Sequence, residues 1–293
     1  MIEHILFRLF LYILFLSCSP YLSAEISDDG KAYEYFLDGE YDLFQNNYHQ
    51  AEINYFKALS INSSSRTILQ SLIDINIFQG DYVDAIQYME KIIELSPNDK
   101  IQGLELFQLY IHEGELDKAP KLLDTLLTYN PDDIDLLYAK ANIQYSKNDW
   151  ENLLRTYHLI YLSNTENSDI LMNIYEIGTA TGQETLSLAI LNDINTQNES
   201  PQLLEFLIDL HSRLHEYSEA INNIKKLINI DNNSEERTIQ LGVLYLFNKQ
   251  FDAVITTLEP LYQNGNYSLK VLRPLLIAYS TVNKTEYQIK ISQ

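Results

Sequence analysis

The chain has 293 residues, and its 41 acidic residues outnumber its 20 basic residues to give a formal net charge of −21. This charge argues against nucleic acid and anionic membrane surfaces as partners, because both are negatively charged themselves. It favours either a basic protein partner or simply a well-solvated outer surface. The length alone would suggest two globular domains, but internal repetition of the sequence predicts one continuous architecture.

The N-terminal 24 residues differ in composition from the rest of the chain. An apolar run from Leu9 to Leu16 follows Arg8, and it is too short to span a bilayer comfortably. It is typical of the apolar core of a secretory signal. Three interpretations stay open: cleavage after Ala24, a lipobox that leaves Cys18 as a lipidated N-terminus, or an uncleaved anchor. All three predict export to the periplasm, with membrane contact only through a lipid or signal anchor.

The rest of the chain divides into a short linker and one folded domain. Cys18 is the only cysteine, so the mature domain is predicted to have no disulfide and no thiol chemistry. Residues 25–31 are polar and are predicted to form a linker. Residues 32–293 are predicted to form the folded domain.

A 34-residue repeat runs through this domain. The stretch "GDYVDAIQYMEKIIELSPND" from Gly80 is echoed by "GELDKAPKLLDTLLTYNPDD" from Gly114 and by "NNYHQAEINYFKALSINSSS" from Asn46. When Gly80 is counted as position 15 of a 34-residue unit, seven units align, and every spacing is 34 except one of 33 before Tyr217. A fixed period in this range predicts a repeat architecture.

Four positions in each unit are spaced as on one face of a helix. Positions 17, 20, 24 and 27 differ by three and four residues, and position 20 is mostly small. Position 24 reads Tyr55, Met89, Leu123, Tyr157, Leu191, Ile224 and Leu258, and position 27 reads Ala58, Ile92, Leu126, Ile160, Ile194, Leu227 and Leu261. Both columns are apolar throughout, so they predict the buried face of a helix in every unit.

A turn precedes this helix, and a stop follows it. Position 15 reads Asn46, Gly80, Gly114, Asn148, Gly182, His215 and Lys249. Gly and Asn tolerate the left-handed conformation that ends a helix, so five of the seven units carry a stop signal. Asp81 and Asp149 follow as expected N-caps of the next helix, and Pro97 and Pro131 cannot continue it. Each unit therefore predicts helix, turn, helix and stop.

This pattern resembles the tetratricopeptide repeat family. The resemblance implies an all-α solenoid of helical hairpins, with about seven 34-residue repeats over residues 32–268 and an eighth first helix around Leu269 to Val282. The chain departs from the family pattern because the tryptophan of the first helix is missing, and glycine at position 8 occurs only as Gly39 and Gly242. Because this fold serves many unrelated pathways, it does not name a function by itself.

The resemblance also implies a binding surface. In the family, positions 2, 5, 9 and 12 of the first helices line a concave groove. In this chain these positions include Asp135, Tyr138, Asn142 and Tyr145 in unit four and Gln70 and Asp74 in unit two. Tyr138 and Tyr145 would offer two flat surfaces, and Asn142 a bidentate amide, to an extended or helical peptide segment. The alternative is that these side chains are merely solvated.

No sequence motif predicts catalysis, a cofactor or a metal site. His211 and His215 are four residues apart but lack the glutamate of a zinc protease motif, and no nucleophile elbow, phosphate-binding loop or dinucleotide fingerprint is present. We therefore expect a non-catalytic interaction scaffold of the bacterial cell envelope. The alternatives are a structural subunit or lipoprotein of an envelope assembly, pilus or secretion machine, or a regulator of a cell-wall enzyme.

Overall fold

The computed structural model describes residues 28–165, 167–230 and 234–282. The expected signal segment with Cys18 and the tail after residue 282 lie outside this part of the chain. Within it, the secondary structure consists of α-helices, turns and short connections. The chain divides into two compact units between Leu136 and Leu137.

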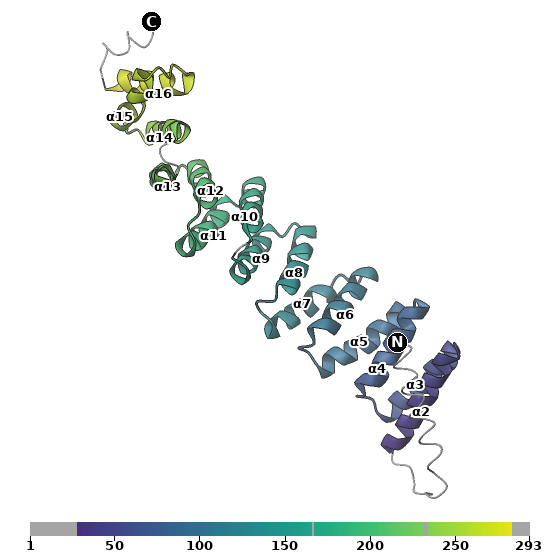
Figure 1. Ribbon diagram of the computed structural model, residues 1–293. Coiled ribbons are helices and arrows are strands. Elements are labelled where there is room, and N and C mark those ends of the chain that lie inside the picture. The colour runs from purple at the N-terminus through teal and green to yellow at the C-terminus, as the bar shows by residue number, and fades with distance from the viewer. Residues whose placement is uncertain (1–27, 166, 231–233, 283–293) are drawn as a thin grey trace, which may run out of the picture. The chain divides into compact units, whose positions relative to one another are not determined.

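The described part of the first unit, residues 28–136, holds six complete helices. They are α2 (Asp28–Phe44), α3 (Tyr48–Ile61), α4 (Arg66–Gln79), α5 (Tyr82–Leu95), α6 (Lys100–His112) and α7 (Lys118–Tyr129). Each helix packs against the next one along the chain, from α2 to α7 (Figure 1). The division between the units falls within the next helix, α8 (Ile134–Ser146).

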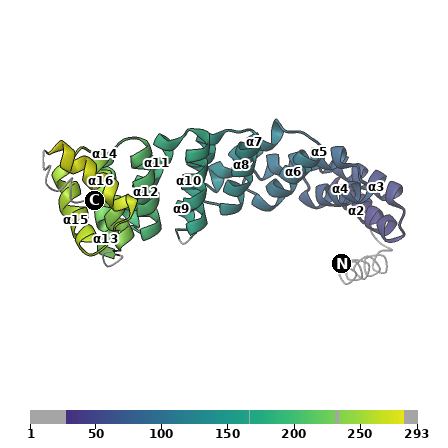
Figure 2. The same ribbon diagram turned by 90° about the horizontal axis from the view of Figure 1, so that it is seen from above.

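The second unit continues the same alternation. Its helices are α9 (Trp150–Ser163), α10 (Ser168–Thr181), α11 (Glu184–Gln197), α12 (Pro201–Arg213), α13 (Tyr217–Ile230), α14 (Glu235–Phe247), α15 (Phe251–Gln263) and α16 (Leu269–Thr281). Consecutive helices again pack together from α9 to α16 (Figure 2). The expected helical hairpins, and the eighth first helix at α16, are therefore confirmed.

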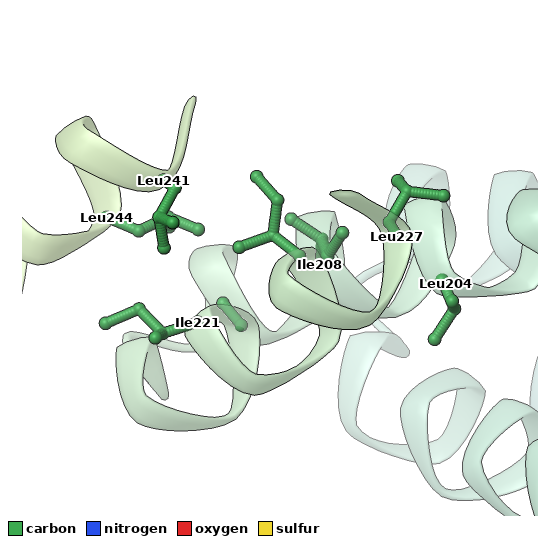
Figure 3. Close-up of a cluster of buried hydrophobic side chains, with 8 residues drawn as sticks. Leu204, Ile208, Ile221, Leu227, Leu241 and Leu244 are labelled. Carbon is green, nitrogen blue, oxygen red and sulfur yellow. The ribbon is translucent and has the colours of Figure 1, made fainter. Parts of the chain in front are cut away.

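The repeat columns form the core. Position 20 is fully buried in all seven units, at Ala51, Ala85, Ala119, Leu153, Ser187, Ala220 and Val254. Positions 24 and 27 are buried as well, with Tyr157 and Leu261 half-buried. Figure 3 shows one such layer, where Leu204 and Ile208 of α12, Ile221 and Leu227 of α13, and Leu241 of α14 belong to one buried cluster. Each fully buried aliphatic side chain contributes roughly 1.5–3 kcal/mol.

Two of the four helical glycines that allow a first helix to approach its second helix occupy the same column. A Cβ on Gly39 would lie 2.6 Å from ring atoms of Tyr55, and a Cβ on Gly242 would lie 2.5 Å from the Leu258 side chain. Both glycines occupy position 8 and both partners occupy position 24. Position 8 is therefore glycine where the side chain at position 24 reaches the backbone of the first helix.

All seven turns adopt the same backbone conformation. The residue at position 15 has a positive φ in each: Asn46 (62°), Gly80 (84°), Gly114 (74°), Asn148 (55°), Gly182 (74°), His215 (62°) and Lys249 (58°). The sequence indicated five of these turns, and the structure adds His215 and Lys249. A β-carbon makes this conformation costly by roughly 1–2 kcal/mol, so packing of the flanking helices holds these two residues there.

The capping prediction was only partly right. Asp81 and Asp149 precede the second helices as expected, but neither side chain makes a capping hydrogen bond, and their ψ angles of 65° and 69° are not those of extended N-caps. The Asp149 carboxylate instead accepts hydrogen bonds from the Asn152 amide, at 3.1 and 2.9 Å.

Two boundaries differ from the regular pattern. Helix α2 begins at Asp28, so residues 28–31, expected in the linker, form its first turn. The 33-residue spacing arises between α11 and α12, which are joined by residues 198–200, whereas residues 62–65 and 96–99 provide four-residue connections in the first unit. Ser200 caps α12 by accepting a hydrogen bond from the Leu203 backbone N–H, and Pro201 occupies the first turn. The 33-residue spacing thus arises because the connection between α11 and α12 is one residue shorter, while neither helix is shortened.

Candidate partner-binding surface

The four candidate residues of unit four lie on α8. Asp135, Tyr138, Asn142 and Tyr145 follow one another at steps of three, four and three residues, so they share one side of this helix. The division between the two compact units falls between Asp135 and Tyr138. Asp135 therefore belongs to the first unit and the other three residues to the second.

Asp135 already has a partner within the first unit. The Lys100 ammonium lies 2.7 Å from a carboxylate oxygen of Asp135 and 2.7 Å from one of Asp133. Hydrogen bonds to Asp133 and then Asp135 raise the pKa of Lys100 above its ordinary value. A partner that binds Asp135 would have to share this carboxylate with Lys100.

Tyr138 is held in place by a residue that sequence reasoning missed. The Asn167 amide donates a hydrogen bond of 3.2 Å to the Tyr138 hydroxyl. The side-chain oxygen of Asn167 accepts a 3.2 Å hydrogen bond from the Asp169 backbone N–H and so caps α10. Asn167 thus caps α10 and also holds the Tyr138 hydroxyl. Its position immediately before the first residues of that helix is a signal for an N-cap that the sequence contains.

Tyr145 presents an exposed ring with a rigid support. It is 59% exposed, and its ring meets Trp150 edge-on with centroids 5.5 Å apart at 79°. Burial, and then the proximity of Tyr138 and Tyr145, raise the pKa of the Tyr157 hydroxyl. Asn142 is exposed on the same side of α8. This region of the second unit therefore combines two supported aromatic rings with one exposed amide.

The two candidates of unit two interact with each other. On α4 the Gln70 amide donates a 2.9 Å hydrogen bond to the Asp74 carboxylate. Their separation of four residues places them one turn apart. The pair is exposed, so both groups can also bind a partner from the solvent side.

The same columns of unit three carry apolar side chains, which sequence reasoning did not single out. On α6, Ile101 is 70% exposed and Ile111 is 41% exposed, while Leu104 is half-buried and Gln108 is exposed. Applying the column numbering to every unit would have found them. The first-helix surface of the first unit is therefore both apolar, on α6, and polar, on α4.

A row of ion pairs joins successive first helices of the first unit. Arg66 binds Asp99, and Lys100 binds Asp133. Partial burial would raise the pKa of each carboxyl, but hydrogen bonds from Arg66 to Asp99 and from Lys100 to Asp133, together with backbone N–H donors, lower both pKa values below the ordinary range. These pairs fix the starts of α4, α6 and α8.

The described histidines have structural positions and do not form a recognisable site. The buried His211 lies 2.8 Å from the Glu216 carboxylate, and His215 occupies a turn. Among the described residues, no group of three or more His, Cys, Asp or Glu is placed to hold a metal ion. Over the same residues, no helix is both long enough and apolar enough to cross a membrane.

Comparison with known proteins gives matches in sequence and in structure. Residues 78–143 match the tetratricopeptide repeat family. A tetratricopeptide repeat protein from Parabacteroides merdae ATCC 43184 is 16% identical over 85% of this chain and 98% of its own, with a TM-score of 0.40. YrrB, described as a tetratricopeptide repeat protein with an unusual peptide-binding site, is 17% identical over 63% of this chain and 96% of its own, with a TM-score of 0.37. No curated protein sequence matches the chain.

Proposed function

Since this chain is a tetratricopeptide repeat protein, with residues 78–143 matching the family sequence, we propose that it is a non-catalytic protein–protein interaction scaffold. It binds a segment of a partner protein on the exposed side of its first helices. The observation that carries this proposal is the pair of supported rings on α8: Tyr138 is held by Asn167 and Tyr145 rests on Trp150.

Support of this kind matters for affinity. Ordering a flexible side chain on binding costs about 0.5–1.5 kcal/mol, and tyrosines already fixed by neighbours avoid part of that cost. Tyrosine and tryptophan are also enriched among residues that dominate binding energy. Between the two rings, the exposed Asn142 amide can donate and accept one hydrogen bond each with a peptide backbone.

The net charge of −21 favours a basic partner. Complementary charge raises the rate of encounter more than it raises affinity. We therefore expect a partner segment with apolar or aromatic side chains that contact the rings, and Lys or Arg residues that speed association at low salt.

In-cell crosslinking with mass spectrometry tests the proposal. The test variant combines Tyr138→Ala, Asn142→Ala and Tyr145→Ala. The control variant combines Leu159→Ala and Leu162→Ala, which remove two exposed side chains from the second helix α9. Partners that crosslink near α8 should disappear in the test variant and persist in the control. Partners unaffected by the test variant would refute binding at this surface.

For location, we propose export to the periplasm or attachment to a membrane facing it. The support is the apolar run from Leu9 to Leu16 and the cysteine at position 18. Lipidation of Cys18 would favour the second candidate function, a structural subunit or lipoprotein of an envelope assembly, pilus or secretion machine. Metabolic labelling with a clickable palmitate, compared between the native chain and Cys18→Ala, separates a lipoprotein from a cleaved or anchored form.

A further inference from the structure

A row of aromatic and apolar side chains runs along the edge of the first unit where each first helix turns into its second helix. Its members, here named the turn-edge row, are Phe44, Tyr48, Phe78, Tyr82, His112 and Leu116. They occupy positions 13 and 17 of units one to three. The groove columns at positions 2, 5, 9 and 12 contain none of them.

Two kinds of step alternate along the row. Within a unit, the residues at positions 13 and 17 flank the left-handed turns at Asn46, Gly80 and Gly114. Between units, ring contacts close the gap: the centroids of Tyr48 and Phe78 are 4.8 Å apart, and those of Tyr82 and His112 are 4.6 Å apart.

Much of the row faces solvent. Phe44 is 50% exposed, Phe78 is 67% exposed and Leu116 is 56% exposed. Exposed apolar side chains scattered singly need no explanation, whereas a connected set of large ones marks an interaction surface.

Acidic side chains border the row. Asp81, Asp84 and Asp117 are exposed at or beside the turns, and the Glu113 carboxylate lies 2.8 Å from the His112 ring nitrogen. The nearby cation Lys118 is already engaged, with its ammonium 3.0 Å from both Glu90 and Glu115. The edge therefore offers apolar and aromatic contact flanked by negative charge.

We propose that the turn-edge row is a second docking surface, which binds a basic amphipathic segment of a partner protein. The apolar side chains of that segment contact Phe44, Phe78 and Leu116, and its Lys or Arg side chains pair with the carboxylates beside the turns. The segment binds along the edge of the hairpins, so it does not compete for the first-helix surface proposed above.

Fluorescence anisotropy of the full chain with a model peptide tests this. The probe is a fluorescein-labelled synthetic helix of Leu and Lys with all leucines on one face, and the control peptide has the same composition in scrambled order. Combining Phe78→Ser with Leu116→Ser should weaken binding of the probe about tenfold. Combining Asp81→Asn with Asp117→Asn should weaken it and reduce its salt dependence.

Matched control variants lie at or just beyond the C-terminal ends of α5 and α7. Leu95→Ser with Tyr129→Ser removes comparably exposed apolar side chains, and Glu94→Gln with Asp132→Asn removes the same charge. Both should leave affinity within about twofold of the native chain. If the control variants weakened binding as much as the test variants, the peptide would be binding without preference for the turn-edge row, and the proposal would be overturned. If Ile101→Ser were the only variant to abolish binding, the peptide would bind the first-helix surface and the proposal would be overturned. Equal affinity for the amphipathic and the scrambled peptide would also overturn the proposal.

Discussion

Replacing Leu123 by alanine tests whether the repeat columns form the core as described. Leu123 is only 1% exposed, and it lies on α7, which packs against α6. Truncating a buried leucine to alanine removes its transfer free energy and leaves a cavity, and together these cost roughly 2–5 kcal/mol. In a repeat protein each unit is stabilised by its neighbours, so α6 and α7 should lose more protection than distant helices.

Urea denaturation followed by far-ultraviolet circular dichroism measures the loss, and hydrogen exchange of α6 and α7 locates it. Leu116→Ala is the matched control, because Leu116 is in the same hairpin but exposed; its effect should stay within about 0.5 kcal/mol. If Leu123→Ala and Leu116→Ala gave equal midpoints, the assignment of position 24 to the core would be refuted.

Three further predictions concern the turns, the site and the charges. Lys249→Gly should raise the free energy of unfolding by up to about 1 kcal/mol in urea denaturation, because glycine removes the cost of a side chain at positive φ. Asn167→Ala should weaken partner binding and change the Tyr138 ring signals in NMR, because it removes the hydrogen bond to that hydroxyl; unchanged ring signals would contradict this role. Because the pKa values of Asp99 and Asp133 are lowered in the folded chain, their stabilisation should be full above pH about 4 and lost as pH falls through the folded values. Acid titration of the double variant Asp99→Asn, Asp133→Asn should therefore show a shallower loss of stability than the native chain.

The helical hairpins were predictable from sequence because seven copies of the same pattern reinforce one another. Each column combines local helix periodicity with a constant spacing, so a weak signal in one unit, such as Glu184 at position 17, did not obscure the rest. The conformation of the turn at Lys249 was not predictable, since lysine does not favour a positive φ, whereas histidine adopts one more often than most residues and gave a weak signal at His215. Tertiary packing of α12 against α13 and of α14 against α15 imposes it.

The candidate surface was predictable only in part. Column numbering placed Tyr138 and Tyr145 on the first-helix surface, but it did not show that Asn167 and Trp150 support them. Those supports come from the next repeat and from the next helix, so they depend on side-chain geometry that the spacing alone does not contain. Ile101 and Ile111 were predictable by the same numbering, because they occupy positions 2 and 12 of unit three.

The connection at residues 198–200 shows where this architecture can be edited. One residue fewer between α11 and α12 leaves the helices on both sides intact, so the connections between hairpins act as joints whose length is independent of the repeat. Short insertions there, such as an epitope or a tetracysteine tag, should leave the columns aligned, while an insertion of one residue inside α11 would rotate half of that helix away from its neighbours by about 100°. The connection at residues 198–200 therefore offers an attachment point for a reporter that involves none of the residues named in the two proposed binding surfaces.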